Sequence, residues 1–361
     1  MDELAACALL ARALHGSPVS VRAAMRRHGS ARAAIAAADL PARLRKALDR
    51  VDGERVDRDL EWLAATGTRL IPWSAASYPE QLAQVAGAPA FLYVRGEAQA
   101  LCAPQIAIVG ARAASAAGRA TAGELAAQLC RSGLAITSGL AIGIDAAAHE
   151  GALASGGVTI GVCAHGLDLI YPREHAELAT RIAASGALVS ELPPGSRPEP
   201  WRFARRNRLV SGLALGTLVV EARCDSGSLI TAAWAQRQSR PVLAVPGSIR
   251  HPGSAGCHAL LRKGAALVEC AADVLAVLKF NVNPQPLAAA NRDAAGTVAA
   301  ARRLDKLSEM LLDALGFEPA SIDELVERTA LPSGHIASML LNLELEGRVA
   351  PHPGGRYCRL S

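Results

Sequence analysis

The chain has 361 residues, of which 51% are hydrophobic and 20% are charged. This length accommodates two or three domains, and the composition excludes a wholly disordered or fibrous chain. The formal net charge of +5 is a mild basic excess, which is compatible with a nucleic-acid partner and does not require one.

The sequence gives no sign of export or membrane insertion. Residues 1–4 place no basic region before an apolar stretch, and uncharged runs such as 151–167 are too short and too rich in Gly and Ser to cross a bilayer. The eight cysteines are scattered, without a C-x-x-C pair or a histidine at zinc spacing. We therefore expect a cytoplasmic protein with reduced thiols, no metal and no membrane contact.

The first 104 residues are predicted to precede the main domain. Residues 1–50 form short helices that are interrupted at 16–18 and 28–30, and they carry more arginines than acids. Two interpretations remain open: a helical bundle solvated by its arginines, which we slightly prefer, or a module that contacts a phosphate backbone. Residues 51–104 are interpreted as a connecting segment with Pro-containing turns.

From residue 105 onward, apolar strands alternate with helices. The predicted strands are 106–109, 134–137, 158–163, 187–190, 217–221 and 241–245. The predicted helices are 116–131, one opening near 145, 174–184, 203–213 and 228–238. Uninterrupted apolar strands that alternate with helices indicate a parallel sheet covered on both faces. Residues 105–280 are therefore predicted to be a Rossmann-like α/β domain with an extended parallel sheet.

The C-terminal part is predicted to be separate. Residues 281–303 lack an amphipathic pattern and are interpreted as a linker. Residues 304–361 contain three predicted helices and a hairpin, which is typical of a winged helix. The third helix, 332–346, has no basic residue except His335. We therefore prefer an accessory or protein-interaction role for this domain over transcriptional regulation through the major groove.

Four turns rich in small residues follow predicted strands. Ligands of an open parallel sheet bind beyond the carboxyl ends of its strands, so these turns are expected to meet at one edge. Small residues let backbone N–H groups approach an anion, and the dipole of a following helix favours it. One such turn is usually structural, but four favour an extended phosphate-binding groove. The candidates in these turns are Gly110, Arg112, Ser115, Ser138, Gly139, Ser226, Gly227, Ser228 and Gly247.

An arginine-rich run, residues 197–208, is the sharpest feature, with five arginines against one glutamate. Guanidinium groups bind phosphates and aromatic rings stack on bases, which is how sequence-independent binding of single strands is built. Trp201 and Phe203 could equally anchor the loop in the core. For the arginines we prefer a bound anion, since a helix N-terminus disfavours clustered positive charge. The candidates in this run are Phe203, Arg205, Arg206, Asn207 and Arg208.

The sequence indicates neither a cofactor nor a catalytic centre. No G-x-G-x-x-G motif follows the first strand of the predicted α/β domain, which disfavours a dinucleotide. Asp145 and His149 lie four residues apart, and we expect a simple hydrogen bond between them rather than an acid–base pair. Without a nucleophile elbow or a metal-ligand cluster in the sequence, we expect a binding protein with no cofactor and no enzymatic activity.

These motifs, in this order, resemble the DNA-processing protein A (DprA/Smf) family over essentially the whole chain. The most specific stretches are Ser138–Asp145, Gly166–Pro172, Phe203–Arg208 and Val245–Ser248. The resemblance implies a sterile-alpha-motif-like N-terminal domain, a Rossmann-like DNA-binding domain and a winged-helix tail. It also implies a non-enzymatic homodimer that binds incoming single-stranded DNA and loads a RecA-type recombinase during natural transformation. The family's DNA-contacting positions correspond to Arg112 and to Phe203–Arg208.

Three positions depart from the family pattern. Ala111 stands where the family has a serine, Ala204 where it commonly has a proline, and Ile142 where a basic residue is frequent. These changes remove a hydroxyl donor, some rigidity and one backbone contact. An alternative of another class is a nucleotide-processing enzyme similar to the phosphoribohydrolases of the same fold. The chain lacks their Pro-Gly-Gly-x-Gly-Thr run, for which residues 246–248 are the nearest match.

Overall fold

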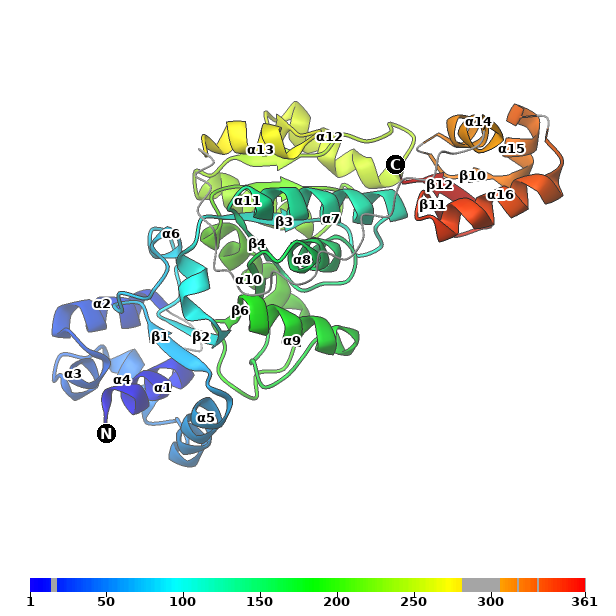
Figure 1. Ribbon diagram of the computed structural model, residues 1–361. Helices are drawn as coiled ribbons and strands as arrows, with labels where there is room; N and C mark the ends of the chain where they lie inside the picture. Colours follow the sequence, from blue (N-terminus) through cyan, green and yellow to red (C-terminus); the bar gives the residue numbers. More distant parts are fainter. Residues whose placement is uncertain (14–17, 281–305, 317, 330, 361) are drawn as a thin grey trace.

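The computed structural model describes residues 1–13, 18–280, 306–316, 318–329 and 331–360 (Figure 1). The predicted linker, 281–303, lies outside the described residues. Among those that are described, no helix is long and apolar enough to cross a membrane.

A single large sheet forms the centre of the molecule. Within the described residues its nine strands have the order β1-β2-β6-β5-β4-β3-β7-β8-β9. The strands are β1 (Arg69–Pro72), β2 (Phe91–Gly96), β3 (Gln105–Val109), β4 (Ala135–Ser138), β5 (Thr159–Val162), β6 (Ala187–Ser190), β7 (Thr217–Val219), β8 (Val242–Ala244) and β9 (Ala266–Leu267). All neighbours from β6 to β9 are parallel. The prediction of an extended parallel sheet in a Rossmann-like domain is therefore confirmed.

The segment 51–104 differs from the predicted connection. Its strand β2 pairs antiparallel with both β1 and β6, so the segment extends the sheet at one edge. It also contains α5 (Gly53–Thr66), the short helix α6 (Glu80–Ala83) and the 3₁₀ turn η1 (Ala98–Cys102). The partner strand β6 is almost a hundred residues further along the chain, and a pairing of that range leaves no local signal in the sequence.

Helices cover both faces of the sheet (Figure 1). On one face α7 (Ala116–Arg131), α8 (Ile144–Ala154) and α13 (Ala271–Leu278) pack around isoleucines of β3 and β4. On the other face α10 (Pro200–Leu213), α11 (Ser228–Arg237) and α12 (Ala255–Arg262) pack around smaller residues of the same strands. The alternation of side chains along each strand separates these two cores.

The N-terminal helices share their core with the edge of the sheet. They are α1 (Glu3–Ala13), α2 (Pro18–His28), α3 (Ala31–Ala36) and α4 (Ala42–Leu48). Leu10 of α1, Phe91 and Tyr93 of β2, and Leu178 of α9 (Ala176–Ser185) belong to one buried cluster. The helical region is thus packed directly against the α/β domain.

The C-terminal domain has the predicted winged-helix architecture. Helices α14 (Lys306–Leu315), α15 (Ile322–Thr329) and α16 (Ser333–Leu345) enclose their own core. A small antiparallel sheet completes the domain; its strands are β10 (Ala320–Ser321), β12 (Arg356–Arg359) and β11 (Val349–His352).

Helices α7 and α8 approach each other closely through glycines. A methyl group added at Gly151 of α8 would lie 2.1 Å from the carbonyl oxygen of Gly123 in α7. At Gly123 the added methyl group would meet only the carbonyl oxygen of Ala147, at 3.5 Å, which is an ordinary contact. The two positions therefore differ sharply in the room they leave for a side chain.

We expect Gly151→Ala to lower the free energy of unfolding by about 1–3 kcal/mol, because it forces two helix backbones apart. The matched control Gly123→Ala should be neutral or stabilising by up to about 1 kcal/mol, since alanine is the better helix former. Urea denaturation of both variants measures the difference. An equal loss of stability in the two variants would contradict this packing.

Candidate nucleic-acid interface

A groove of about 690 Å³ opens at the carboxyl ends of the central strands. Its walls come from the turns after β3, β4 and β7, from the first half of α10 and from residues 251–253. This is the edge at which ligands of open parallel sheets bind, and the structure has a groove where the sequence predicts one. We refer to this cavity as the groove.

The structure brings most of the predicted residues to this groove. Those that line it are Gly110, Arg112, Gly139, Phe203, Arg206, Asn207, Ser226, Gly227 and Ser228. Ser115 and Gly247 line a neighbouring cavity of about 370 Å³ instead. Arg205 lies at a smaller cavity of about 260 Å³ beside Trp201, while Ser138 and Arg208 are buried.

The exposed Arg112 and the half-buried Phe203 form a cationic and aromatic pair in the groove. The guanidinium of Arg112, on the turn after β3, lies 5.4 Å from the centre of the Phe203 ring. The ring of Tyr171 packs against that of Phe203 in a tilted arrangement, with the ring centres 5.6 Å apart and the ring planes at 54°. Phe203 is therefore not a core anchor. A charge that can bind phosphate lies beside aromatic faces on which bases can stack.

The groove-facing turns hold one another in place. Gly143 has a φ of +87°, and a methyl group there would lie 2.2 Å from the carbonyl oxygen of Ala111. The N–H of Ile144 donates to that same carbonyl at 3.2 Å. Glycine at this point of the second turn thus allows the first turn, which carries Arg112, to pack against it.

The start of α7 is not free to bind an anion. Both carboxylate oxygens of Glu221 accept from the Ser115 N–H at 3.2 Å, and one accepts from the Ser115 hydroxyl at 2.7 Å. His251 approaches the same carboxylate at 3.3 Å. The predicted anion site at Ser115 is therefore wrong, because a carboxylate of the chain itself already occupies this helix N-terminus.

Arg206 is a buried structural group rather than an exposed phosphate ligand. Its side chain is 6% exposed, and Nη1 donates to the carbonyl oxygen of Gly139 at 2.5 Å and to that of Val162. Asp145 supplies the neighbouring negative charge and accepts from the Gly139 N–H at 3.0 Å. The backbone carbonyls and this carboxylate, not a bound anion, account for a cation at this place.

The neighbouring arginines of the run are also paired within the chain. Glu191, after β6, binds Arg208 and contacts Arg205 at 3.2 Å. Arg208 is 6% exposed and cannot reach a ligand, whereas Arg205 is partly exposed. The expectation that clustered arginines at this helix start require a bound anion is wrong for Arg206 and Arg208. Carboxylates far along the chain supply the negative charge, and backbone carbonyls accept the hydrogen bonds of Arg206.

The predicted hydrogen bond between Asp145 and His149 is wrong. Nδ1 of His149 contacts the Thr159 hydroxyl at 2.6 Å, and that hydroxyl donates to the carbonyl oxygen of Ile136 at 2.9 Å. The Thr159 oxygen is thus the acceptor, and Nδ1 of His149 carries the proton. Burial, and then the nearby charges of His175 and Arg206, lower the pKa of His149 to about 3. His149 is therefore neutral and part of the core.

Some residues in or beside the groove are not among the predicted site residues. Tyr171, in the stretch Gly166–Pro172, does not line the groove but packs against Phe203, which does. Arg223 is exposed, lines the groove and lies just beyond the end of β7, so its position was a signal that could have found it. His251 arrives from the segment after β8 through long-range packing, for which no local pattern exists.

Comparisons with known proteins agree with this architecture. Residues 69–279 match the family of DNA recombination-mediator protein A. Protein Smf of Escherichia coli K12 is 41% identical over 308 residues, which are 84% of this chain and 81% of that protein. The chain belongs to the DNA recombination-mediator protein A family. Residues 295–355 match the winged-helix domain of the same family.

Other members of the family extend the comparison. DNA processing protein DprA of Bacillus subtilis is 42% identical over 209 residues, covering 58% of this chain and 70% of that protein. The X-ray structure of DNA processing protein A from Streptococcus pneumoniae matches 74% of this chain and 95% of that chain, with a TM-score of 0.66 and 32% identity. The corresponding protein of Helicobacter pylori, described for its single-stranded DNA binding mode, matches 59% of this chain and 97% of that chain, with a TM-score of 0.53 and 29% identity.

The third helix of the winged-helix domain exposes leucines and polar residues rather than arginine or lysine. In α16, Leu341 and Leu345 are 57% and 79% exposed. The helix carries no arginine or lysine between Ser333 and Leu345. The surface of this helix lacks the basic side chains with which a recognition helix in the major groove contacts bases and the flanking phosphates.

We expect Arg206→Ala to lower the free energy of unfolding by about 3–5 kcal/mol, because it leaves Asp145 buried without its cation. Arg112→Ala, which removes an exposed guanidinium, should stay within about 0.5 kcal/mol of the parent. Urea denaturation followed by circular dichroism measures both. A small and equal effect of the two substitutions would contradict the buried role of Arg206.

Proposed function

We propose that this chain binds single-stranded DNA in the groove and, as a recombination mediator, loads a RecA-type recombinase on that strand during DNA uptake. The observation that carries the proposal is the pair of the exposed Arg112 and the half-buried Phe203, with the exposed ring of Tyr171 packed against Phe203. Unpaired bases offer the faces that such rings stack on, and the phosphates between them bind guanidinium groups. The single-strand binding described for the Helicobacter pylori relative supports the same assignment.

The proposal includes a homodimer without enzymatic activity. Three carboxylates line the groove. Asp145 accepts from the Gly139 N–H near the charge of Arg206, Glu221 is hydrogen-bonded to Ser115 and lies 3.3 Å from His251, and Asp225 lies 3.3 Å from Arg223. All three are engaged by groups of the chain itself, which disfavours the phosphoribohydrolase alternative. Release of free base from nucleoside monophosphates by the purified protein would contradict a purely binding role.

Arg112→Ala is expected to weaken the binding of single-stranded oligonucleotides about five- to tenfold, since it removes a phosphate contact and a cation beside the stacking ring. The slope of log Kd against log salt concentration should fall by about 0.7. The matched control is Arg237→Ala, because Arg237 lies 5.2 Å from the Trp234 ring centre and does not line the groove. Fluorescence anisotropy across a salt series measures both. Equal weakening by the two substitutions would place the binding site elsewhere.

Loading of the recombinase is tested by sedimentation. At a limiting concentration of the host's RecA-type recombinase, addition of the chain should increase the fraction of recombinase that pellets with single-stranded DNA. Arg112→Ala should reduce this gain and Arg237→Ala should preserve it. If the pelleted fraction is unchanged by the parent protein while the chain itself binds the DNA, the binding assignment stands and the loading role fails.

A further inference from the structure

A second cleft, of about 560 Å³, lies between the N-terminal helices and the loop that leads into α10. We call it the arginine cleft. It is lined by the five arginines Arg12, Arg50, Arg55, Arg197 and Arg202 and by the two acids Asp52 and Glu199. None of the residues that line the arginine cleft lines the groove.

Two of the five arginines are neutralised within the chain. Arg12 is paired with Asp59 at 2.5 Å, and both side chains are largely buried. Arg202 is paired with Glu199 at 2.8 Å. These guanidinium groups build the walls of the cleft rather than offering free charge.

The other three arginines leave the arginine cleft with uncompensated positive charge. Arg50, Arg55 and Arg197 are exposed, and within the described part of the chain none has a carboxylate at ion-pair distance. Asp52, which lines the same cleft, lies 3.8 Å from Arg58 instead. Three like charges across one cleft repel one another until an anion enters it.

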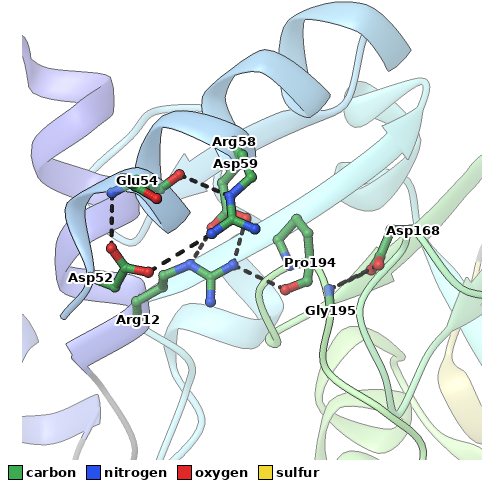
Figure 2. A network of polar contacts seen from close by, with 8 residues as sticks. All are labelled: Arg12, Asp52, Glu54, Arg58, Asp59, Asp168, Pro194 and Gly195. Atoms are coloured by element: carbon green, nitrogen blue, oxygen red, sulfur yellow. Dashed lines mark hydrogen bonds and ion pairs between the residues drawn. The ribbon is translucent and has the colours of Figure 1, made fainter.

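The loop that carries Arg197 is fastened by hydrogen bonds at Pro194 and Gly195 (Figure 2). Arg12 donates to the carbonyl oxygen of Pro194 at 3.1 Å, which ties this loop to the N-terminal helices. From the other side, both oxygens of Asp168 accept from the Gly195 N–H at 2.9 Å. A site held in this way loses little conformational entropy when a ligand binds.

The arginine cleft continues the groove around the start of α10. Glu199 lines the arginine cleft, while its neighbour Pro200 lines the groove. Phe203, which stacks in the groove, lies one helical turn further along the same helix. A strand that leaves the groove past Phe203 meets the three unpaired arginines next.

We propose that the arginine cleft binds the phosphates of the same single strand where it leaves the groove, so that the N-terminal helices form one wall of a longer binding path. The inference rests on the proposed function. It selects a single-stranded nucleic acid because the cleft offers separate cations from two parts of the chain and adjoins the groove at the neighbouring residues Glu199 and Pro200, which suits a chain of phosphates.

The test compares two double variants that remove the same charge. Arg50→Ala with Arg55→Ala empties the N-terminal wall of the arginine cleft. Arg32→Ala with Arg43→Ala removes two exposed arginines of the same helical region that do not line it. Each protein is titrated with oligo-dT of about 6 and about 20 nucleotides, lengths chosen to fill the groove alone or to extend past it.

The arginine-cleft variant is expected to bind the longer oligonucleotide about five- to tenfold more weakly, with a salt slope lower by about 1.4, and the shorter one within about twofold of the parent. The Arg32/Arg43 control should match the parent with both. Unchanged binding of the longer oligonucleotide, or equal weakening with both lengths or in both variants, would overturn the inference. Failure of the parent to bind either length would instead overturn the proposed function, as would Arg112→Ala having no effect on the shorter one.

Discussion

The hydrogen bonds of the buried Arg206 guanidinium are the interaction on which the shape of the groove depends. They fasten α10 to the carboxyl ends of β4 and β5 through the carbonyl oxygens of Gly139 and Val162, beside the carboxylate of Asp145. Because the cation replaces water at two strand ends, it fixes the helix that presents Phe203. Arg206 of the run thus shapes the groove, while the exposed arginine in it, Arg112, comes from the turn after β3.

The arginines of the run 197–208 therefore have different roles: some are buried and structural, and others are exposed. Arg206 and Arg208 are buried and structural. Arg205 is partly exposed and shares the carboxylate of Glu191 with Arg208, whereas Arg197 is exposed and has no carboxylate at ion-pair distance among the described residues. The number of arginines in such a run therefore does not predict how many of them contact a ligand. The partners that decide the role of each arginine come from other strands.

The parallel sheet, the winged helix and the location of the groove could be predicted from the sequence, because apolar strands, helix periodicity and small-residue turns are local patterns. Helix α7 and strand β6 have the predicted bounds. The pairing of β2 with β6 and the burial of Arg206 could not be predicted, since both depend on residues far apart in the chain. The same holds for Glu221, whose carboxylate fills the helix start at Ser115.

The shared core of the N-terminal helices and the sheet edge has a practical consequence. Leu10, Phe91 and Tyr93 are buried against one another, and β2 covers the open side of β6. A shortened protein that began at β3 would expose this apolar surface together with an unpaired strand edge, which is a template for aggregation. A shortened protein that keeps the groove and stays in solution therefore has to start at α1. The parallel part of the sheet, by contrast, begins only at β3, about a hundred residues later.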